Sequence, residues 1–272
     1  MTDELFAVKD KIVVVTGGLG QLGRQYTLAL AGRGARVAVF DLSRPDERTI
    51  ADRFSVEGGD IAFYVVDITS HDSIQHGLDA VKEKWEVPHA LINNAALDSP
   101  PDAPAEETGP FETYPEDSWD AVLDVNLKGT FLCCQVIGGA MAQAGRGSII
   151  NISSVYGTHS PNQTIYNYRA QRTGIPFFKP VAYSASKSGV MNLTRYLATY
   201  WARQGVRVNT LTLAGVFNYQ DDEFVSNYTR LVPMGRMANE DEYNGAIIFL
   251  ASEASSFMTG ANLVVDGGWT AW

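Results

Sequence analysis

Hydrophobic and polar positions along this chain follow two patterns that alternate from one end to the other. Short runs of β-branched and other apolar residues, typical of buried strands, occupy residues 12–16, 36–40, 61–66, 90–93, 148–152, 206–212 and 263–265. Longer stretches with apolar residues at helical spacing lie at 22–31, 72–85, 119–144, 184–204 and 240–251. This alternation predicts an α/β fold with a doubly wound parallel sheet and helices on both faces.

Two segments interrupt the alternation. Residues 98–115 contain five prolines, and residues 158–180 also lack periodicity. The first segment is too short to link two domains, so it predicts a surface loop. With no other boundary in a chain of 272 residues, we expect residues 1–272 to form a single domain.

Composition narrows the classes of function. Hydrophobic residues make up 45% of the chain and charged residues 19%, as in a globular protein with a sizeable core. The net charge of -10 repels a phosphate backbone and disfavours nucleic-acid binding. The adjacent Cys133 and Cys134 point apart on one helix, which disfavours a disulfide and favours core packing. Neither a signal peptide nor a long apolar run is evident, so we expect a cytoplasmic protein without a membrane partner.

A glycine-rich loop follows the first predicted strand and opens the first predicted helix. Residues 16–23 are Thr-Gly-Gly-Leu-Gly-Gln-Leu-Gly. Glycine permits a tight turn and a close approach to a diphosphate, and a helix N-terminus offers free N–H groups. We expect Gly17 and Gly23 to serve the turn and the packing, and Gly20 the close approach.

An acidic residue, Asp41, ends the second predicted strand. A carboxylate there can accept hydrogen bonds from the adenine ribose, and it repels a 2′-phosphate, so it favours NAD over NADP. Two readings remain open, because Asp41 can instead cap the following turn, and Arg44 lies close enough to weaken the preference.

Further motifs follow in a fixed order. They are Asp67-Ile68, Asn93-Asn94-Ala95-Ala96, Asn126, Ser154, Tyr183-Ser184-Ala185-Ser186-Lys187 and Asp266-Gly267-Gly268. Together with the glycine loop they resemble the short-chain dehydrogenase/reductase family, whose fold is the Rossmann sheet, over residues 9–268. The resemblance implies a nicotinamide cofactor, NAD with NADP the lesser candidate, and a homotetramer or homodimer. It implies cofactor binding by Gly17, Leu19, Gly20, Gln21, Leu22, Gly23, Asp41, Asp67, Ile68, Asn94, Ala95, Ala96, Tyr183, Lys187, Gly215, Val216 and Phe217.

The chemistry explains this choice of residues. Tyr183 and Lys187 are four residues apart and share one face of a helix. A nearby ammonium favours the phenolate, so Tyr183 can exchange a proton with a substrate oxygen near neutral pH. The resemblance implies that Ser154 holds that oxygen and that Asn126 anchors a water leading to Lys187. The catalytic set is therefore expected to be Asn126, Ser154, Tyr183 and Lys187.

The chain also departs from the family pattern. Gln21 stands where shorter members usually have a glycine, and Tyr219 stands where a threonine usually contacts the nicotinamide. Leu213-Ala214-Gly215 replaces the usual Pro-Gly. Ser154 and Tyr183 are 29 residues apart, more than is usual, so the resemblance implies an insertion near residues 158–180.

The charged residues of that insertion, Arg169, Arg172 and Lys179, are all positive. They lie among aromatic residues, so the segment is either a wall that contacts an anionic or hydroxyl-rich substrate, or a surface loop or subunit contact. Phe217, Asn218, Tyr219 and Gln220 are further candidates for the pocket, although core packing could equally explain the two aromatic residues. The histidines show no spacing for a metal site. Trp269 and Trp272 form an apolar tail that we expect to pack.

These features predict an NAD-dependent oxidoreductase that interconverts a secondary alcohol and a ketone on a sugar- or polyol-like substrate. Two alternatives remain: an epimerase or dehydratase that keeps NAD bound, and a nucleotide-sensing protein without catalysis.

Overall fold

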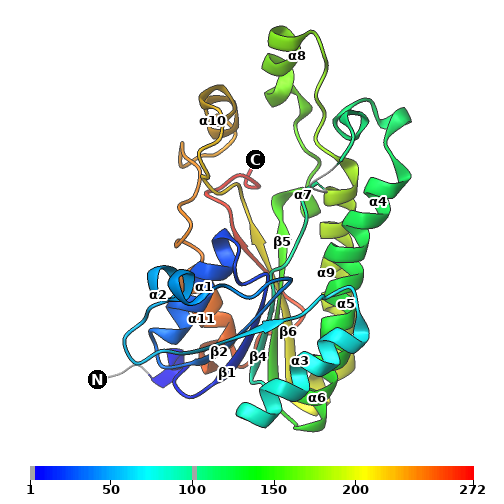
Figure 1. Cartoon of the computed structure of the whole chain (residues 1–272). Coiled ribbons are helices and arrows are strands. Elements are labelled where there is room, and N and C mark those ends of the chain that lie inside the picture. Colours follow the sequence, from blue (N-terminus) through cyan, green and yellow to red (C-terminus); the bar gives the residue numbers. More distant parts are fainter. Residues whose placement is uncertain (1–3, 100–102) are drawn as a thin grey trace.

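The computed structural model describes residues 4–99 and 103–272, and within them a seven-stranded parallel sheet forms the centre (Figure 1). Its strands are β1 Ile12–Thr16, β2 Arg36–Asp41, β3 Asp60–Val65, β4 Ala90–Asn93, β5 Gly147–Ser154, β6 Val206–Leu213 and β7 Asn262–Val265. They lie in the order β3-β2-β1-β4-β5-β6-β7. The order reverses direction between β1 and β4, and a crevice for ligands forms at such a point, outside the carboxyl ends of the strands.

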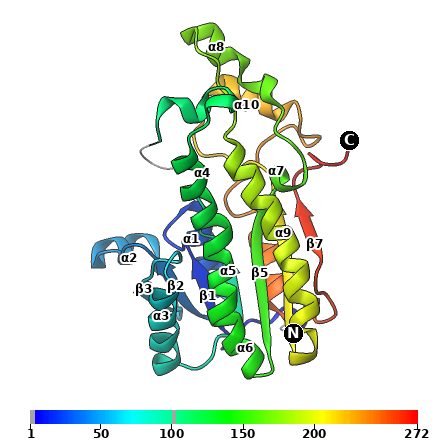
Figure 2. The ribbon, with the colours of Figure 1, turned by 90° about the vertical axis from the view of Figure 1, so that its right-hand side faces the viewer.

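Helices cover both faces of the sheet. The main ones are α1 Gln21–Ala31, α2 Glu47–Arg53, α3 His71–Lys84, α4 Glu116–Leu123, α5 Thr130–Cys133, α6 Gly139–Gln143, α9 Val181–Trp201 and α11 Asn244–Ala251. Three further helices are α7 Val155–Thr158, α8 Asn167–Thr173 and α10 Asp222–Thr229. Turns of π-helix, Asp124–Gly129 and Cys134–Gly138, join α4, α5 and α6 into one run that lies beside α9 (Figure 2).

Alternate residues of the central strands enter different cores. Val14 and Leu91 face a cluster that includes side chains of α3, α5 and α9. Val13 and Ile92 face a cluster formed with α1 and α11. All five residues of β1 are buried, which explains why the strands read as continuous apolar runs rather than as alternating ones.

Each predicted strand is present, with ends that differ by at most two residues. The predicted helix over 240–251 was wrong at its start, because residues 240–243 form turns and α11 begins at Asn244. The prediction of irregular loops was wrong in part. Short helices lie at Ala105–Thr108, Phe111–Thr113, Gln163–Tyr166 and α8. Residues 1–3 and 100–102, which the sequence predictions also covered, lie outside the described residues.

One long, apolar helical run bears on the expectation that the chain has no membrane-spanning helix. Among the described residues, Glu116–Gln143 is long and apolar enough to cross a membrane by length and composition. Half of its most apolar stretch is buried inside the molecule, as in a core helix of a soluble protein. This helical run is therefore only weak evidence for a membrane-spanning segment. Cys133 and Cys134 lie on this run as free, buried thiols, which confirms the expected core packing.

Candidate active site

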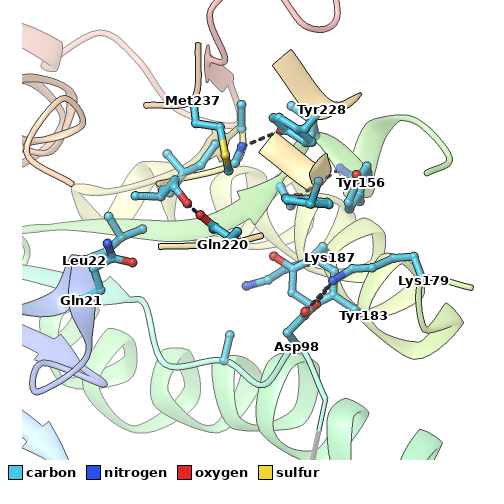
Figure 3. Close-up of a pocket in the computed structure, with 18 of the residues that line it drawn as sticks. Gln21, Leu22, Asp98, Tyr156, Lys179, Tyr183, Lys187, Gln220, Tyr228 and Met237 are labelled. Atoms are coloured by element: carbon cyan, nitrogen blue, oxygen red, sulfur yellow. Dashed lines mark hydrogen bonds and ion pairs between the residues drawn. The ribbon is translucent and has the colours of Figure 1, made fainter. Parts of the chain in front are cut away.

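Two cavities open at the carboxyl ends of the strands. One, of about 580 Å³, lies over the glycine loop and the ends of β2 and β3. The other, of about 600 Å³, lies over the ends of β5 and β6 and is walled by the 158–180 segment (Figure 3). Both are lined by Gln21, Leu22, Asn94 and Ala96, so they join at the start of α1. One elongated ligand can therefore reach from Asp41 to Ser154.

The glycine loop is shaped for a close approach. Gly17 has a φ of +62°, and a Cβ there would lie 2.8 Å from the Ala95 Cα atom. A Cβ on Gly23 would lie 2.2 Å from the Gly17 carbonyl oxygen. Gly20 is the N-cap of α1, and no side chain caps the first turn of that helix. The loop and the helix start thus fit the diphosphate of a dinucleotide.

Two polar side chains, at the ends of the strands that flank β1, hold this loop. Asp41 accepts hydrogen bonds from the backbone N–H of Leu19, at 3.0 Å, and of Leu42, at 2.9 Å. Asn94 donates to the carbonyl oxygens of Thr16, at 3.0 Å, and Gly17, at 3.1 Å. Asp41 also lines the 580 Å³ cavity, so its capping role and a role toward a ribose are compatible.

All the predicted cofactor residues except Gly23 and Phe217 line one of the two cavities. Lining the 580 Å³ cavity are Gly17, Leu19, Gly20, Gln21, Leu22, Asp41, Asp67, Ile68, Asn94, Ala95 and Ala96. Lining the 600 Å³ cavity are Tyr183, Lys187, Gly215 and Val216. Asp67 also accepts a hydrogen bond from the Thr69 N–H at 2.8 Å, which closes the turn after β3.

The loop after β6 differs from the expectation for its aromatic residues. Gln220 lines the 600 Å³ cavity, but Phe217, Asn218 and Tyr219 do not. Tyr219 is 90% exposed and has a φ of +56°, which turns its side chain outward. The Tyr219 side chain therefore does not line the cavity. Phe217 serves through its backbone instead, because its carbonyl oxygen accepts a hydrogen bond from the Gln21 side chain at 2.9 Å. A glycine at position 21 could not make this link.

Tyr183, Lys187 and Ser154 meet at one wall of the 600 Å³ cavity (Figure 3). Tyr183 and Lys187 project from the same face of α9, with the Lys187 Nζ atom 5.8 Å from the Tyr183 ring centroid. Lys187 is 3% exposed and donates a hydrogen bond to the Ile152 carbonyl oxygen at 2.9 Å. Ser154 ends β5, next to α9, and its hydroxyl accepts a hydrogen bond from the Tyr156 N–H.

Asn126 lies behind this wall, in a π turn. Its side chain accepts a hydrogen bond from the Leu97 N–H at 2.7 Å and donates to the Leu97 carbonyl at 2.8 Å. It also donates to the Ser186 hydroxyl at 3.0 Å. In the structure Asn126 therefore fixes the segment after β4 against α9, and its link to Lys187 through a water stays a prediction.

Burial is the main cause of the shifted pKa values of Tyr183 and Lys187. It raises the pKa of the Tyr183 phenol well above its ordinary value, the charge of Asp98 raises it further, and hydrogen bonding to Ser154 opposes both. Burial lowers the pKa of Lys187 to about 8, and Asp98 acts in the opposite direction. Near neutral pH, Lys187 is thus mostly an ammonium beside a phenol.

A second lysine, Lys179 of the 158–180 segment, lies near the same ring. The Lys179 Nζ atom lies 5.1 Å from the Tyr183 ring centroid and forms an ion pair with Asp98 (Figure 3). Asp98 was seen only as part of a loop. Its position five residues after Asn93 is the one sequence signal that could have placed it at the end of β4.

Aromatic side chains complete the wall of the 600 Å³ cavity. They are Tyr156, Tyr166, Phe177, Phe224 and Tyr228. Behind them Trp269 is buried against Tyr156, with ring centroids 5.8 Å apart, whereas Trp272 is exposed. The expectation that the tail packs is thus confirmed for Trp269, and for Trp272 packing across a subunit interface stays a prediction. Among the described residues, no group of histidine, cysteine and acidic side chains could hold a metal ion.

The chain is similar to known proteins in both sequence and fold. The family model described as enoyl-(acyl carrier protein) reductase matches residues 20–270. The D-threitol dehydrogenase of Mycolicibacterium smegmatis is 34% identical over 270 residues, covering 97% of this chain and 95% of that protein. A short-chain dehydrogenase from Leptospira borgpetersenii with bound NAD+ has a TM-score of 0.83 and 31% identity, with 99% and 96% coverage. A gluconate 5-dehydrogenase from Burkholderia cenocepacia in complex with NADP and tartrate has a TM-score of 0.85 and 28% identity, with 99% and 98% coverage.

Proposed function

This chain belongs to the short-chain dehydrogenase/reductase family, and we propose that it is an NAD-dependent oxidoreductase for a sugar- or polyol-like substrate. At the coarser level the family places it among enzymes that interconvert an alcohol and a ketone with a nicotinamide cofactor. The observation that carries the proposal is the meeting of Ser154, Tyr183 and Lys187 in a cavity continuous with the glycine loop.

The residues of the crevice suit a dinucleotide. Gly17, Gly20 and the start of α1 would hold the diphosphate, Asp41 the adenine ribose, and Lys187 the nicotinamide ribose. When bound, the cofactor supplies the chemistry of hydride transfer. All further steps fall to side chains of this chain.

These side chains transfer one proton between Tyr183 and the substrate oxygen. The Ser154 hydroxyl is placed to hydrogen-bond the substrate oxygen, next to the Tyr183 phenol. During alcohol oxidation the Tyr183 phenolate accepts the proton from that oxygen, and during ketone reduction the phenol returns it. The Lys187 ammonium stabilises the phenolate form of Tyr183.

The polyol assignment rests on the relatives and on the polar lining of the cavity. D-Threitol dehydrogenase is the name of one relative, and a gluconate 5-dehydrogenase is a structural neighbour. In this chain the cavity presents Ser154, Lys179 and Gln220 beside its aromatic wall. Such a mixture of hydrogen-bonding groups and aromatic faces suits a substrate with several hydroxyl groups.

The choice of NAD rests on Asp41. We expect the wild-type protein to oxidise members of a panel of linear polyols with NAD far faster than with NADP, because the carboxylate repels a 2′-phosphate. Replacing Asp41→Ser keeps an oxygen beside the Leu19 N–H and removes the charge. The ratio of kcat/KM for NADP to that for NAD should then rise at least about tenfold, or about 1.4 kcal/mol.

The matched control is Asp67→Asn, in the same cavity. It is expected to leave that ratio within about threefold, since the Asp67 carboxylate already closes its own turn. Equal use of both cofactors by the wild type would contradict the NAD assignment. Reduction of neither cofactor by any polyol would contradict the proposed substrate class.

A further inference from the structure

The 158–180 segment places one exposed arginine, Arg169, on the cavity wall. The Arg169 guanidinium lies over the Phe177 ring, with its Cζ atom 4.0 Å from the ring centroid. Its Nε–H donates to the Tyr168 hydroxyl at 3.4 Å, and Arg169 lines the cavity that contains Ser154 and Tyr183. Aromatic contacts, rather than a carboxylate, thus orient this side chain.

Charge pairing singles out the same residue. The charged residues that line this cavity are Asp98, Arg169, Lys179, Lys187 and Asp221. Asp98 is paired with Lys179, and Asp221 is paired with Arg172 at 2.8 Å. Within residues 4–99 and 103–272, neither Arg169 nor Lys187 forms an ion pair with a carboxylate, but Lys187 is buried and already donates a hydrogen bond to the Ile152 carbonyl oxygen. The terminal N–H groups of Arg169 therefore remain available to a ligand.

The helix that carries Arg169 is held in place by a neighbour. Arg172, one turn further along α8, pairs with Asp221 at 2.8 Å and with Glu223 at 2.9 Å, at the start of α10. Figure 2 shows α8 above α10 at the end of the molecule that holds the carboxyl ends of the strands. Arg172 thus joins α8 to the start of α10. The Arg169 side chain, on the same helix, lines the cavity.

We infer that Arg169 binds a negatively charged group, a carboxylate or a phosphate, on the hydroxyl-rich substrate. The inference rests on the proposed function, and it narrows the substrate to a sugar acid or a phosphorylated polyol. A planar guanidinium with free N–H groups binds either anion through two parallel hydrogen bonds. In a chain of net charge -10, an anionic substrate needs such a local cation.

The test compares three probes of the same carbon skeleton: D-sorbitol, which is neutral, D-gluconate and D-sorbitol 6-phosphate. For the wild type we expect kcat/KM for at least one anionic probe to exceed that for sorbitol by at least about tenfold. Arg169→Gln should remove most of this advantage, so the ratio of kcat/KM for the anionic probe to that for sorbitol should fall toward one. Arg169→Lys should keep part of this advantage, because lysine retains the positive charge but lacks the planar guanidinium that forms two parallel hydrogen bonds.

Arg203→Gln is the control, since it removes one positive charge from an exposed residue after α9 that does not line the cavity. It should change kcat/KM for all three probes by a common factor. The inference is overturned if the wild type favours sorbitol, or if Arg169→Gln lowers all three values equally.

A binding measurement separates this inference from the proposed function. Titration calorimetry with the NAD-loaded protein measures the affinity for each probe without turnover. Anion binding that depends on Arg169, without oxidation of any probe, would support the inference and contradict the proposed oxidation of these substrates. Absence of Arg169-dependent anion binding would overturn the inference even if sorbitol is oxidised.

Discussion

Replacing Tyr183→Phe is expected to lower kcat by roughly 10³-fold in both directions of the reaction, because the substitution removes the proton carrier alone. The ring keeps its place near Lys179 and Lys187, at 5.1 and 5.8 Å from their Nζ atoms. Folding and cofactor affinity should therefore stay close to those of the wild type. Steady-state kinetics, together with calorimetry of NAD binding, provide the measurement.

The chain offers a matched control in Tyr156→Phe. Tyr156 lines the same cavity, and its hydroxyl is buried without a hydrogen-bond partner among the described residues. Loss of that hydroxyl should change kcat only a few-fold. If Tyr183→Phe keeps kcat within a few-fold of the wild type, or if Tyr156→Phe is equally damaging, Tyr183 is not the proton carrier.

The second large effect is expected for Lys187→Met, which removes the cation and keeps most of the side-chain volume. We expect kcat for oxidation near neutral pH to fall by roughly 10²-fold, because less of Tyr183 is phenolate. The sign follows from the charge: an ammonium nearby favours the phenolate and lowers the phenol pKa, so its loss raises that pKa. The rising limb of the pH profile for oxidation should move to higher pH by at least about one unit.

A purely structural role for Lys187 would give a different result. Its hydrogen bond to the Ile152 carbonyl oxygen also supports β5, so some loss of stability accompanies the substitution. Lower stability alone reduces the amount of active protein but leaves the pH profile in place. A Lys187→Met variant with reduced kcat and an unmoved profile would show that the charge does not act on Tyr183.

Much of the fold and the core of the site could be predicted because the signals are local. Buried strands read as short apolar runs, and the four-residue spacing of Tyr183 and Lys187 puts them on one helix face. The strand order then brings Ser154, at the end of β5, to the same wall. The switch between β1 and β4 accounts for the position of Asp41 and Asn94 around the glycine loop.

The features that were missed depend on contacts distant in sequence. Helix α8 is short and polar, and it is held by the stacking of Arg169 on Phe177 and by the ion pairs of Arg172 with α10. The sequence of α8 has no apolar periodicity from which a helix could be predicted, because tertiary contacts stabilise this helix. The pairing of Asp98 with Lys179 joins residues 81 apart for the same reason.

The most direct test of the account follows the hydrogen on the reacting carbon. The protein is incubated with NAD and with a polyol that it accepts, deuterated at the carbinol carbons. We predict that one deuterium appears in the reduced nicotinamide for each ketone formed, and that Tyr183→Phe forms both products roughly 10³-fold more slowly. Deuterium retained in an isomer of the substrate or exchanged into water, with no reduced cofactor accumulating, would contradict an oxidoreductase and indicate an epimerase or dehydratase. Cofactor binding without any change in the polyol would indicate a nucleotide-sensing protein.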